Sequence, residues 1–380
     1  MTTFLIYDDS LRSPEMRHEI GEMVMDPITF IEHDGKRLVV GSEFEKDIFA
    51  KREDVVDEFW NIFDFGFEDL TRDQTFPEPL IGSEILRRAL ERLGAHKVVV
   101  PETFHLQVAD YLRERGVEVV VDEEAWSLRR RKKTPWEIEG MERAQRAAET
   151  AMLTAARMLR ETEGTATRDL RFEGEILTAE MIREAMVQEL LSQGCDSEEI
   201  LVHSGDACLA GHDPGTGPIL PNASCIIDCF PRDRRTGTYT DMSRTFVPGK
   251  PSEELRALHQ HCRTALTIAL EVIRPGRDDA HQSVVNYFHE QGLPTREHHA
   301  GAGPLKEGFS HSLGHGVGLQ VHEKPWVGRR PDVLQEGDVI AIEPGLYFRG
   351  VGGVRLEDTV LVTPEGPEHF TDPYPYELEP

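Results

Sequence analysis

The stretch CIIDCF at residues 225–230 places one carboxylate, that of Asp228, inside an apolar run. The pattern recurs where Glu343 follows VIAI and where Glu357 lies within VRLEDTV, residues 354–360. Short apolar runs of this kind predict buried strands, and burying an unpaired carboxylate costs several kcal/mol. We therefore expect positive charge to lie among these three acids.

A fourth acid, Asp241, opens the segment DMSRTF. A turn-rich segment separates Asp228 from Asp241, so two strands of a hairpin would bring both carboxylates to the same end of a sheet. A glycine-rich loop separates Glu343 from Glu357, which repeats the arrangement. Four carboxylates at one place repel one another unless cations balance them, and two divalent ions would do so.

The segment HSLGHGVGLQVHE, residues 311–323, carries three histidines among closely spaced glycines. Glycines allow backbone and imidazole groups to approach a common point. A phosphate loop is excluded because no G-x-x-x-x-G-K-[ST] motif is present. A single histidine is usually a core residue, but three in so short a segment indicate a site.

A chain of 380 residues favours two domains. The N-terminal third alternates predicted strands and helices, including a hairpin turn at Asp34-Gly35, which is typical of an α/β domain. The basic run RRRKK at 129–133 ahead of a proline is interpreted as a solvated linker. An amphipathic helix is predicted over 136–160. We predict domains of residues 1–134 and 135–380.

The net charge of -27 argues against binding to nucleic acid or to anionic lipid. The first residues lack the pattern of a signal peptide, and no apolar run is long enough to span a bilayer, so a cytoplasmic location is expected. The five cysteines are interpreted as reduced. Cys225 and Cys229, which flank Asp228, are predicted to be small core residues and not metal ligands.

Together these segments resemble the pita-bread metallopeptidases, which include methionine aminopeptidase, aminopeptidase P and prolidase. The resemblance covers roughly residues 135–370 and rests on four segments that occur in the family's order: DMSRTF from Asp241, GHGVG with VHE up to Glu323, EPGLY from Glu343, and RLED around Glu357. The predicted N-terminal α/β domain is similar to that of creatinase, aminopeptidase P and prolidase. His311 also resembles the proline-specific members, and creatinase lacks the metal set.

The resemblance implies a metal site and its ligands. The implied ligands are Asp228, Asp241, His315, Glu343 and Glu357, with Asp241 and Glu357 bridging two divalent ions. The long interval after Asp228 leaves Asp233 as a competitor, but Asp233 lies among arginines that would pair it on a surface. Four oxygen ligands and one imidazole suit Mn²⁺, with Co²⁺, Fe²⁺ or Zn²⁺ as alternatives.

The implied activity is that of an Xaa-Pro aminopeptidase, which removes the residue preceding proline from a proline-containing peptide. Glu343 is implied as proton acceptor, and hydrogen bonds to the substrate are expected from His212, for which His203 is a rival, and from His311 and His322. Tyr347 and Arg355 are predicted to bind substrate, although Arg355 could instead pair with a ligand carboxylate. A homodimer is expected from the family's tendency. The alternatives are a prolidase acting on dipeptides, a non-peptidase metalloenzyme such as a lyase, and a silent peptide-binding module.

Overall fold

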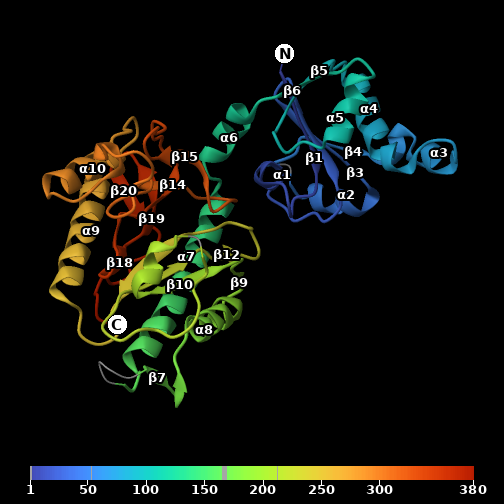
Figure 1. Ribbon diagram of the computed structural model, residues 1–380. Helices are drawn as coiled ribbons and strands as arrows, with labels where there is room; N and C mark the ends of the chain where they lie inside the picture. The colour runs from blue at the N-terminus through green and yellow to red at the C-terminus, as the bar shows by residue number, and fades with distance from the viewer. Residues whose placement is uncertain (1, 53, 165–168, 212) are drawn as a thin grey trace. The chain divides into compact units, whose positions relative to one another are not determined.

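The computed structural model describes residues 2–52, 54–164, 169–211 and 213–380. The chain divides into two compact units, Met1–Arg130 and Arg131–Pro380 (Figure 1). The two units have separate hydrophobic cores. The domain limits of 1–134 and 135–380 stay a prediction. Within the described ranges, every helix is too short or too polar to cross a membrane.

A mixed six-stranded sheet with the strand order β4-β3-β2-β1-β5-β6 organises the first unit. β2 pairs antiparallel with β1 and β3, and the other pairs are parallel. Helices cover both faces of this sheet. The elements are β1 (Thr3–Asp8), α1 (Pro14–Ile20), β2 (Ile28–His33), β3 (Lys36–Gly41), α2 (Glu43–Phe49), β4 (Glu58–Asn61), α3 (Phe67–Arg72), α4 (Ile81–Leu93), β5 (Lys97–Val100), α5 (Leu106–Arg113), β6 (Glu118–Val121) and α6 (Glu123–Arg131).

The predicted hairpin of this unit is confirmed. Asp34 and Gly35 adopt φ angles of 51° and 76°, which is the backbone conformation that a tight turn between β2 and β3 requires. The sequence also predicts that Thr103 caps the next helix. That prediction is wrong, because α5 begins at Leu106 after His105, whose side chain makes no capping hydrogen bond.

The interpretation of the basic run as a solvated linker is also wrong. α6 continues through it to Arg131, and three of its five cations are buried. Composition reveals the charges of such a run but not the distant acids that meet them. The ion pairs within the first unit are Arg129 with Glu19 and Glu32, and Arg130 with Glu15; those within the second are Arg131 with Asp338, and Lys133 with Glu323.

The second unit consists mainly of short strands and four long helices among its described residues. The predicted helix over 136–160 is confirmed as α7, which begins with a capping box between Thr134 and Glu137. The elements are α7 (Pro135–Arg160), β7 (Arg171–Phe172), β8 (Glu175–Ile176), α8 (Ala179–Ser192), β9 (Cys195–Asp196), β10 (Ile200–Ser204), β11 (Cys225–Cys229), β12 (Arg232–Asp233), β13 (Met242–Phe246), α9 (Glu253–Val272), α10 (Ala280–Glu290), β14 (Gly314–Gly316), β15 (Glu323–Val327), β16 (Val339–Ile342), β17 (Gly345–Phe348), β18 (Gly352–Arg355), β19 (Asp358–Thr363) and β20 (Gly366–His369).

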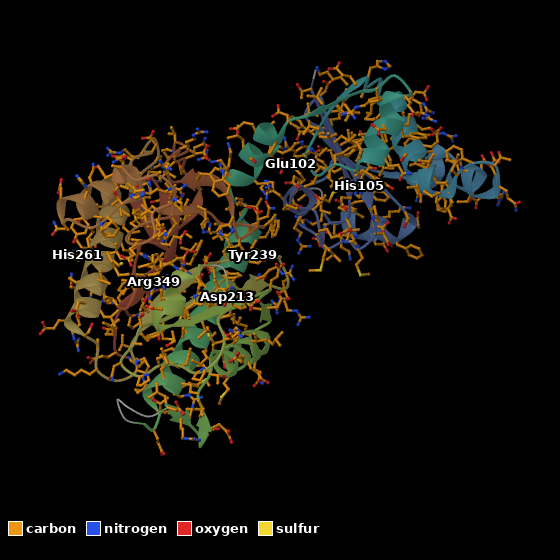
Figure 2. All side chains as sticks on the ribbon, in the orientation of Figure 1. Glu102, His105, Asp213, Tyr239, His261 and Arg349 are labelled. Atoms are coloured by element: carbon orange, nitrogen blue, oxygen red, sulfur yellow. The ribbon has the colours of Figure 1, made fainter. Side chains whose placement is uncertain are left out.

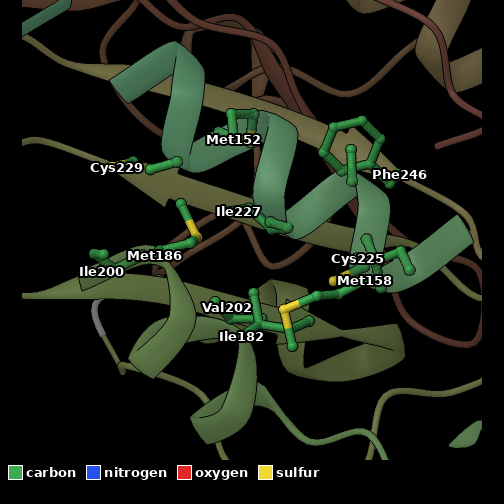
Figure 3. Packing of buried hydrophobic residues seen from close by; sticks show 14 of the residues in the cluster. Met152, Met158, Ile182, Met186, Ile200, Val202, Cys225, Ile227, Cys229 and Phe246 are labelled. Carbon is green, nitrogen blue, oxygen red and sulfur yellow. The ribbon is translucent and has the colours of Figure 1, made fainter. Parts of the chain in front are cut away.

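Two antiparallel sheets form the frame of this unit. α7 and α8 pack against the sheet β10-β11-β13, and Figure 3 shows Met152 and Met186 beside Ile227 in this core. α9 and α10 contribute to a second core with the sheet β15-β14-β16-β19-β20. Cys225 and Cys229 face the first core and are free thiols, as predicted. Because side chains alternate along a strand, Asp228 faces away from that core.

Candidate metal centre

Strand pairing brings the first two acids together. β11 and β13 are antiparallel neighbours, with Asp228 opposite Ser243 and Cys229 opposite Met242. Asp241 immediately precedes Met242, so both carboxylates lie at the same end of the strand pair. The hairpin prediction for Asp228 and Asp241 is therefore confirmed.

The second pair of acids is assembled in the same way on the other sheet. β16 and β19 are antiparallel, with Ile342 opposite Asp358. Glu343 directly follows β16 and Glu357 directly precedes β19, so the two glutamates lie at one end of this pair. The intervening residues form the separate hairpin of β17 and β18.

His315 lies at the centre of β14, which pairs with β15 on one side and with β16 on the other. The glycines on either side of it are required for this close pairing. A Cβ atom on Gly314 would lie 1.9 Å from the carbonyl oxygen of Ala341, and one on Gly316 would lie 2.3 Å from that of Lys324. The two glycines thus allow β14, with His315 between them, to lie close to both neighbouring strands.

The side chains of these elements converge on one buried place. Asp241, His315 and Glu357 offer ligand atoms that all lie within 4.8 Å of one another. Nε2 of His315 is 3.8 Å from Oδ2 of Asp241 and 4.0 Å from Oε1 of Glu343. Asp228 joins the group through Ser243, whose Oγ lies 2.8 Å from Oδ1 of Asp228 and 2.7 Å from Oε2 of Glu357.

Crowding and burial shift the proton equilibria of this cluster. Burial, and then repulsion from Glu357, raise the pKa values of Asp241 and Glu343 well above their ordinary values. Burial and the charge of Asp228 raise the pKa of Glu357 to about 8. Burial, followed by the nearby His322, lowers the pKa of His315 to about 4. Without a further cation, these shifts favour the neutral forms of Asp241, Glu343, Glu357 and His315.

These residues fit divalent metal ions. Among the described residues, Oδ1 of Asp241 has no hydrogen-bond partner although it is buried. Such an atom costs free energy unless it is ligated. The donor set of carboxylate oxygens and one imidazole is the kind that binds hard and intermediate divalent cations.

Arg355 supplies the positive charge that the sequence leads one to expect among the acids. Its guanidinium donates to Oδ2 of Asp228 and, at 2.9 Å, to Oγ of Ser243. Of the two interpretations of Arg355, the structure shows the pairing, with the carboxylate of Asp228, a proposed ligand. Its contact with substrate stays a prediction.

The predicted substrate-side residues are only partly brought together. His311 lies beside the cluster, with Nδ1 3.8 Å from Oε2 of Glu343 and Nε2 3.1 Å from the hydroxyl of Tyr347. The ring of His322 is 4.2 Å from that of His315. His212 lies outside the described residues. Its rival is engaged elsewhere, because the buried His203 contacts the carbonyl oxygen of Asp213.

Asp233, the competitor of Asp228, has a different role. It is 2% exposed on β12 and forms a bidentate pair with Arg143 of α7 at 3.1 and 2.9 Å. The expectation that it lies on the surface is therefore wrong, although its pairing with an arginine is confirmed. The partner is an arginine of α7 and not one of the arginines next to Asp233 in the sequence, so local sequence could not predict this pair.

Two contributors are missing from the sequence prediction. The position of Ser243 could have been predicted, because it lies two residues after Asp241 and so on the same face of the strand; it links Asp228 and Glu357. The role of Lys133 could not have been predicted from the sequence, because its partner Glu323 is far away in the chain.

Fold and site together define a metal-binding α/β protein. The chain belongs to metallopeptidase family M24, whose sequence profile matches residues 139–364. It is 39% identical over 135 residues to the Xaa-Pro dipeptidase of Pyrococcus horikoshii, a match that covers 35% of this chain and 35% of that protein. The match thus spans about a third of the length of that relative.

Solved structures resemble the chain over nearly its whole length. The Xaa-Pro dipeptidase from Bacillus anthracis has a TM-score of 0.77 at 21% identity, covering 99% of this chain and 94% of that one. The X-Pro aminopeptidase from Thermotoga maritima MSB8 has a TM-score of 0.75 at 20% identity, covering 100% and 97%. These comparisons confirm the predicted two-domain fold with a pita-bread second domain.

Proposed function

We propose that this protein is a metal-dependent Xaa-Pro aminopeptidase, which hydrolyses the bond between an N-terminal residue and a following proline. The observation that carries the proposal is the buried cluster of Asp241, His315 and Glu357, in which one carboxylate oxygen has no partner among the described residues. Membership of a metallopeptidase family and the proline-specific names of the relatives support it.

Two divalent ions would be held by Asp228, Asp241, His315, Glu343 and Glu357, with Mn²⁺ preferred for this donor set. When bound, such ions supply Lewis acidity and lower the pKa of water. Glu343 and His311 are neighbours: Nδ1 of the imidazole donates to the carbonyl oxygen of Ser312 at 2.7 Å and lies 3.8 Å from the carboxylate. Glu343 would accept the proton of the attacking water.

His311 and His322 would donate hydrogen bonds to the substrate carbonyl and to the departing nitrogen. Tyr347 holds His311 through their 3.1 Å contact. This contact requires glycine at position 345, because a Cβ atom on Gly345 would lie 2.5 Å from the Tyr347 hydroxyl and 3.0 Å from Nε2 of His311. Proline lacks an amide hydrogen, so a pocket for its ring with a histidine near its nitrogen would select it.

A second candidate function, that of an Xaa-Pro dipeptidase, differs from the first only in the length of the peptide substrate. The relative from Pyrococcus horikoshii is a dipeptidase, which favours action on free Xaa-Pro dipeptides. Comparison of Ala-Pro with Ala-Pro-Xaa peptides of increasing length distinguishes the two. The homodimer and the cytoplasmic location stay predictions.

The test is a comparison of kcat/KM for proline and non-proline peptides in saturating Mn²⁺. We expect Ala-Pro and Ala-Pro-Xaa to be cleaved at least about 10²-fold more efficiently than Ala-Ala counterparts, a gap of about 2.7 kcal/mol in transition-state binding. Equal values for the two series would contradict the proline specificity. Failure to cleave any peptide would favour the non-peptidase alternative.

A further inference from the structure

The basic run ends in a lysine that is buried in the second unit with one acid. The side chains of Lys133 and Glu323 are 2% and 3% exposed, and Nζ of the lysine contacts Oε1 of the glutamate. The other carboxylate oxygen accepts a hydrogen bond from the N–H of Gln320 at 3.3 Å. A buried ion pair is tolerated where such additional hydrogen bonds satisfy its atoms. The carboxylate of Glu323 is therefore held at a fixed place within the loop 317–323.

This ion pair packs directly on the backbone of the loop. A Cβ atom on Gly318 would lie 2.4 Å from Oε1 of Glu323 and 2.8 Å from Nζ of Lys133. The carbonyl of Gly318 accepts a hydrogen bond from the N–H of Tyr239, at 2.8 Å; Tyr239 is labelled in Figure 2 and lies just before Asp241 in the chain. The loop that joins His315 to His322 is thus attached both to Lys133 and to the segment that leads into Asp241, a proposed ligand.

The position of Glu323 constrains the residue before it. Glu323 opens β15 and lies opposite Gly316, next to His315. His322 lies in the bend directly before this strand and is exposed, whereas Glu323 is buried. The ring of His322 lies 4.2 Å from that of His315, so the residue that Lys133 holds adjoins the histidine pair in the chain.

A second ion pair fixes the segment that carries Lys133. Arg131 donates to Oδ1 of Asp338 at 2.9 Å and to Oδ2 at 2.5 Å, and the carboxylate of Asp338 is completely buried. Asp338 immediately precedes β16, the strand that leads to Glu343. The backbone around Lys133 is therefore held beside the strands of the site.

We propose that Lys133 is a positioning residue for the reaction, which acts through Glu323 to hold His322 beside His315. This inference rests on the proposed function, because that function assigns His322 to the substrate. Lys133 would touch neither substrate nor metal, because it is buried against Glu323, so its loss should change the rate of the chemical step more than it changes binding.

The first experiment compares two neighbouring lysines in the Mn²⁺-loaded full chain. Lys133→Met should lower kcat for Ala-Pro by about 10-fold or more while KM and metal content stay within about twofold, as expected for a misplaced catalytic group. Lys132→Met is the matched control, because Lys132 is exposed, and it should leave kcat unchanged. Equal effects of the two substitutions, or an unchanged kcat in Lys133→Met, would overturn the proposal.

A double-mutant cycle tests the route through His322. If Lys133 acts through His322, Lys133→Met should have little further effect on kcat once His322→Ala has removed the imidazole. A purely structural role predicts that Lys133→Met lowers kcat by the same factor in both backgrounds, and that result would overturn the proposal.

Hydrogen exchange provides a readout that does not depend on activity. Because Lys133→Met leaves a buried carboxylate unpaired and could prevent folding, the variant Lys133→Met/Glu323→Gln removes both charges. Its amides should exchange faster than those of the wild type over residues 314–327 and at the wild-type rate over residues 225–246. Unchanged exchange in the loop, or faster exchange throughout the second unit, would overturn the proposal. A wild-type protein that cleaves no proline peptide would refute the proposed function, whereas the exchange experiment would still test the loop.

Discussion

Ser243 lies between two acids that are distant in the sequence, Asp228 and Glu357. It accepts a hydrogen bond from Arg355 and has one hydrogen of its own to donate, yet it lies within hydrogen-bond distance of both carboxylates. A proton on one of the two acids would let both of them bond to the hydroxyl when metal is absent. The raised pKa of Glu357, about 8, favours this acid as the site of that proton near neutral pH.

We expect Ser243→Ala to weaken Mn²⁺ binding by about 10- to 100-fold, because residues that orient metal ligands typically contribute this much. Isothermal titration with Mn²⁺ measures the change, and circular dichroism checks that the fold is retained. Wild-type affinity in a folded Ser243→Ala protein would show that the hydroxyl does not orient the ligands.

The stability of the metal-free protein should decrease as pH rises from 6.5 to 8. The pKa of Glu357 is about 8 when folded and 4.5 as its ordinary value, so the folded state binds more protons in this range and loses that stabilisation as they dissociate. The lowered pKa of His315 acts in the opposite direction, but only between about 4 and 6.5. The contribution of Glu357 over this range is at most about 2 kcal/mol.

Urea unfolding in the presence of a chelator at the two pH values measures this decrease. Glu357→Gln cannot release the proton, so the decrease should be smaller in that variant. An equal decrease in wild type and Glu357→Gln would assign the pH dependence to other groups.

Among the elements, the long connection between β11 and β13 is bound to α7 through the ion pair of Asp233 with Arg143. Burial works to raise the pKa of Asp233, but hydrogen bonds from Arg143 and Thr236 lower it overall. Asp233→Asn should therefore reduce the free energy of unfolding by about 1–3 kcal/mol, because it weakens charge-assisted hydrogen bonds in a buried place. It should not change the metal content.

Asp196→Asn is the matched control for that prediction, because Asp196 pairs with Arg232 in the same pair of short strands but is 32% exposed. An exposed ion pair contributes less than about 1 kcal/mol. Urea unfolding and elemental analysis of both variants decide the matter. Loss of metal in Asp233→Asn would restore Asp233 as a ligand candidate.

The sequence was sufficient to predict elements whose signals are local. The hairpin at Asp34-Gly35, the helix α7 and the buried strands around Asp228 all follow from periodicity, turn chemistry or an acid within an apolar run. Contacts between distant segments were not predictable in this way. The basic run and Asp233 were misplaced because their partners come from elsewhere in the chain, and neither residue type nor spacing identifies a distant partner.

At the scale of the whole molecule, metal binding should stabilise the protein, because the folded state assembles ligands that the unfolded chain leaves scattered. We expect two divalent ions per chain by elemental analysis. Free Mn²⁺ at about 100 times its dissociation constant should raise the free energy of unfolding by about 2.7 kcal/mol per site. A protein that binds no Mn²⁺ and is equally stable in chelator would contradict the metal centre.

The five cysteines have a practical consequence for such experiments. All are buried free thiols, and all follow residue 190, so all lie in the second unit. Burial raises their pKa values, that of Cys195 to about 11, so few thiolates are available to react while the protein is folded. An alkylating reagent would therefore label the unmodified protein only as the second unit opens. Mass spectrometry of Cys225 and Cys229 would time the opening of β11, the strand that carries Asp228, without an introduced probe.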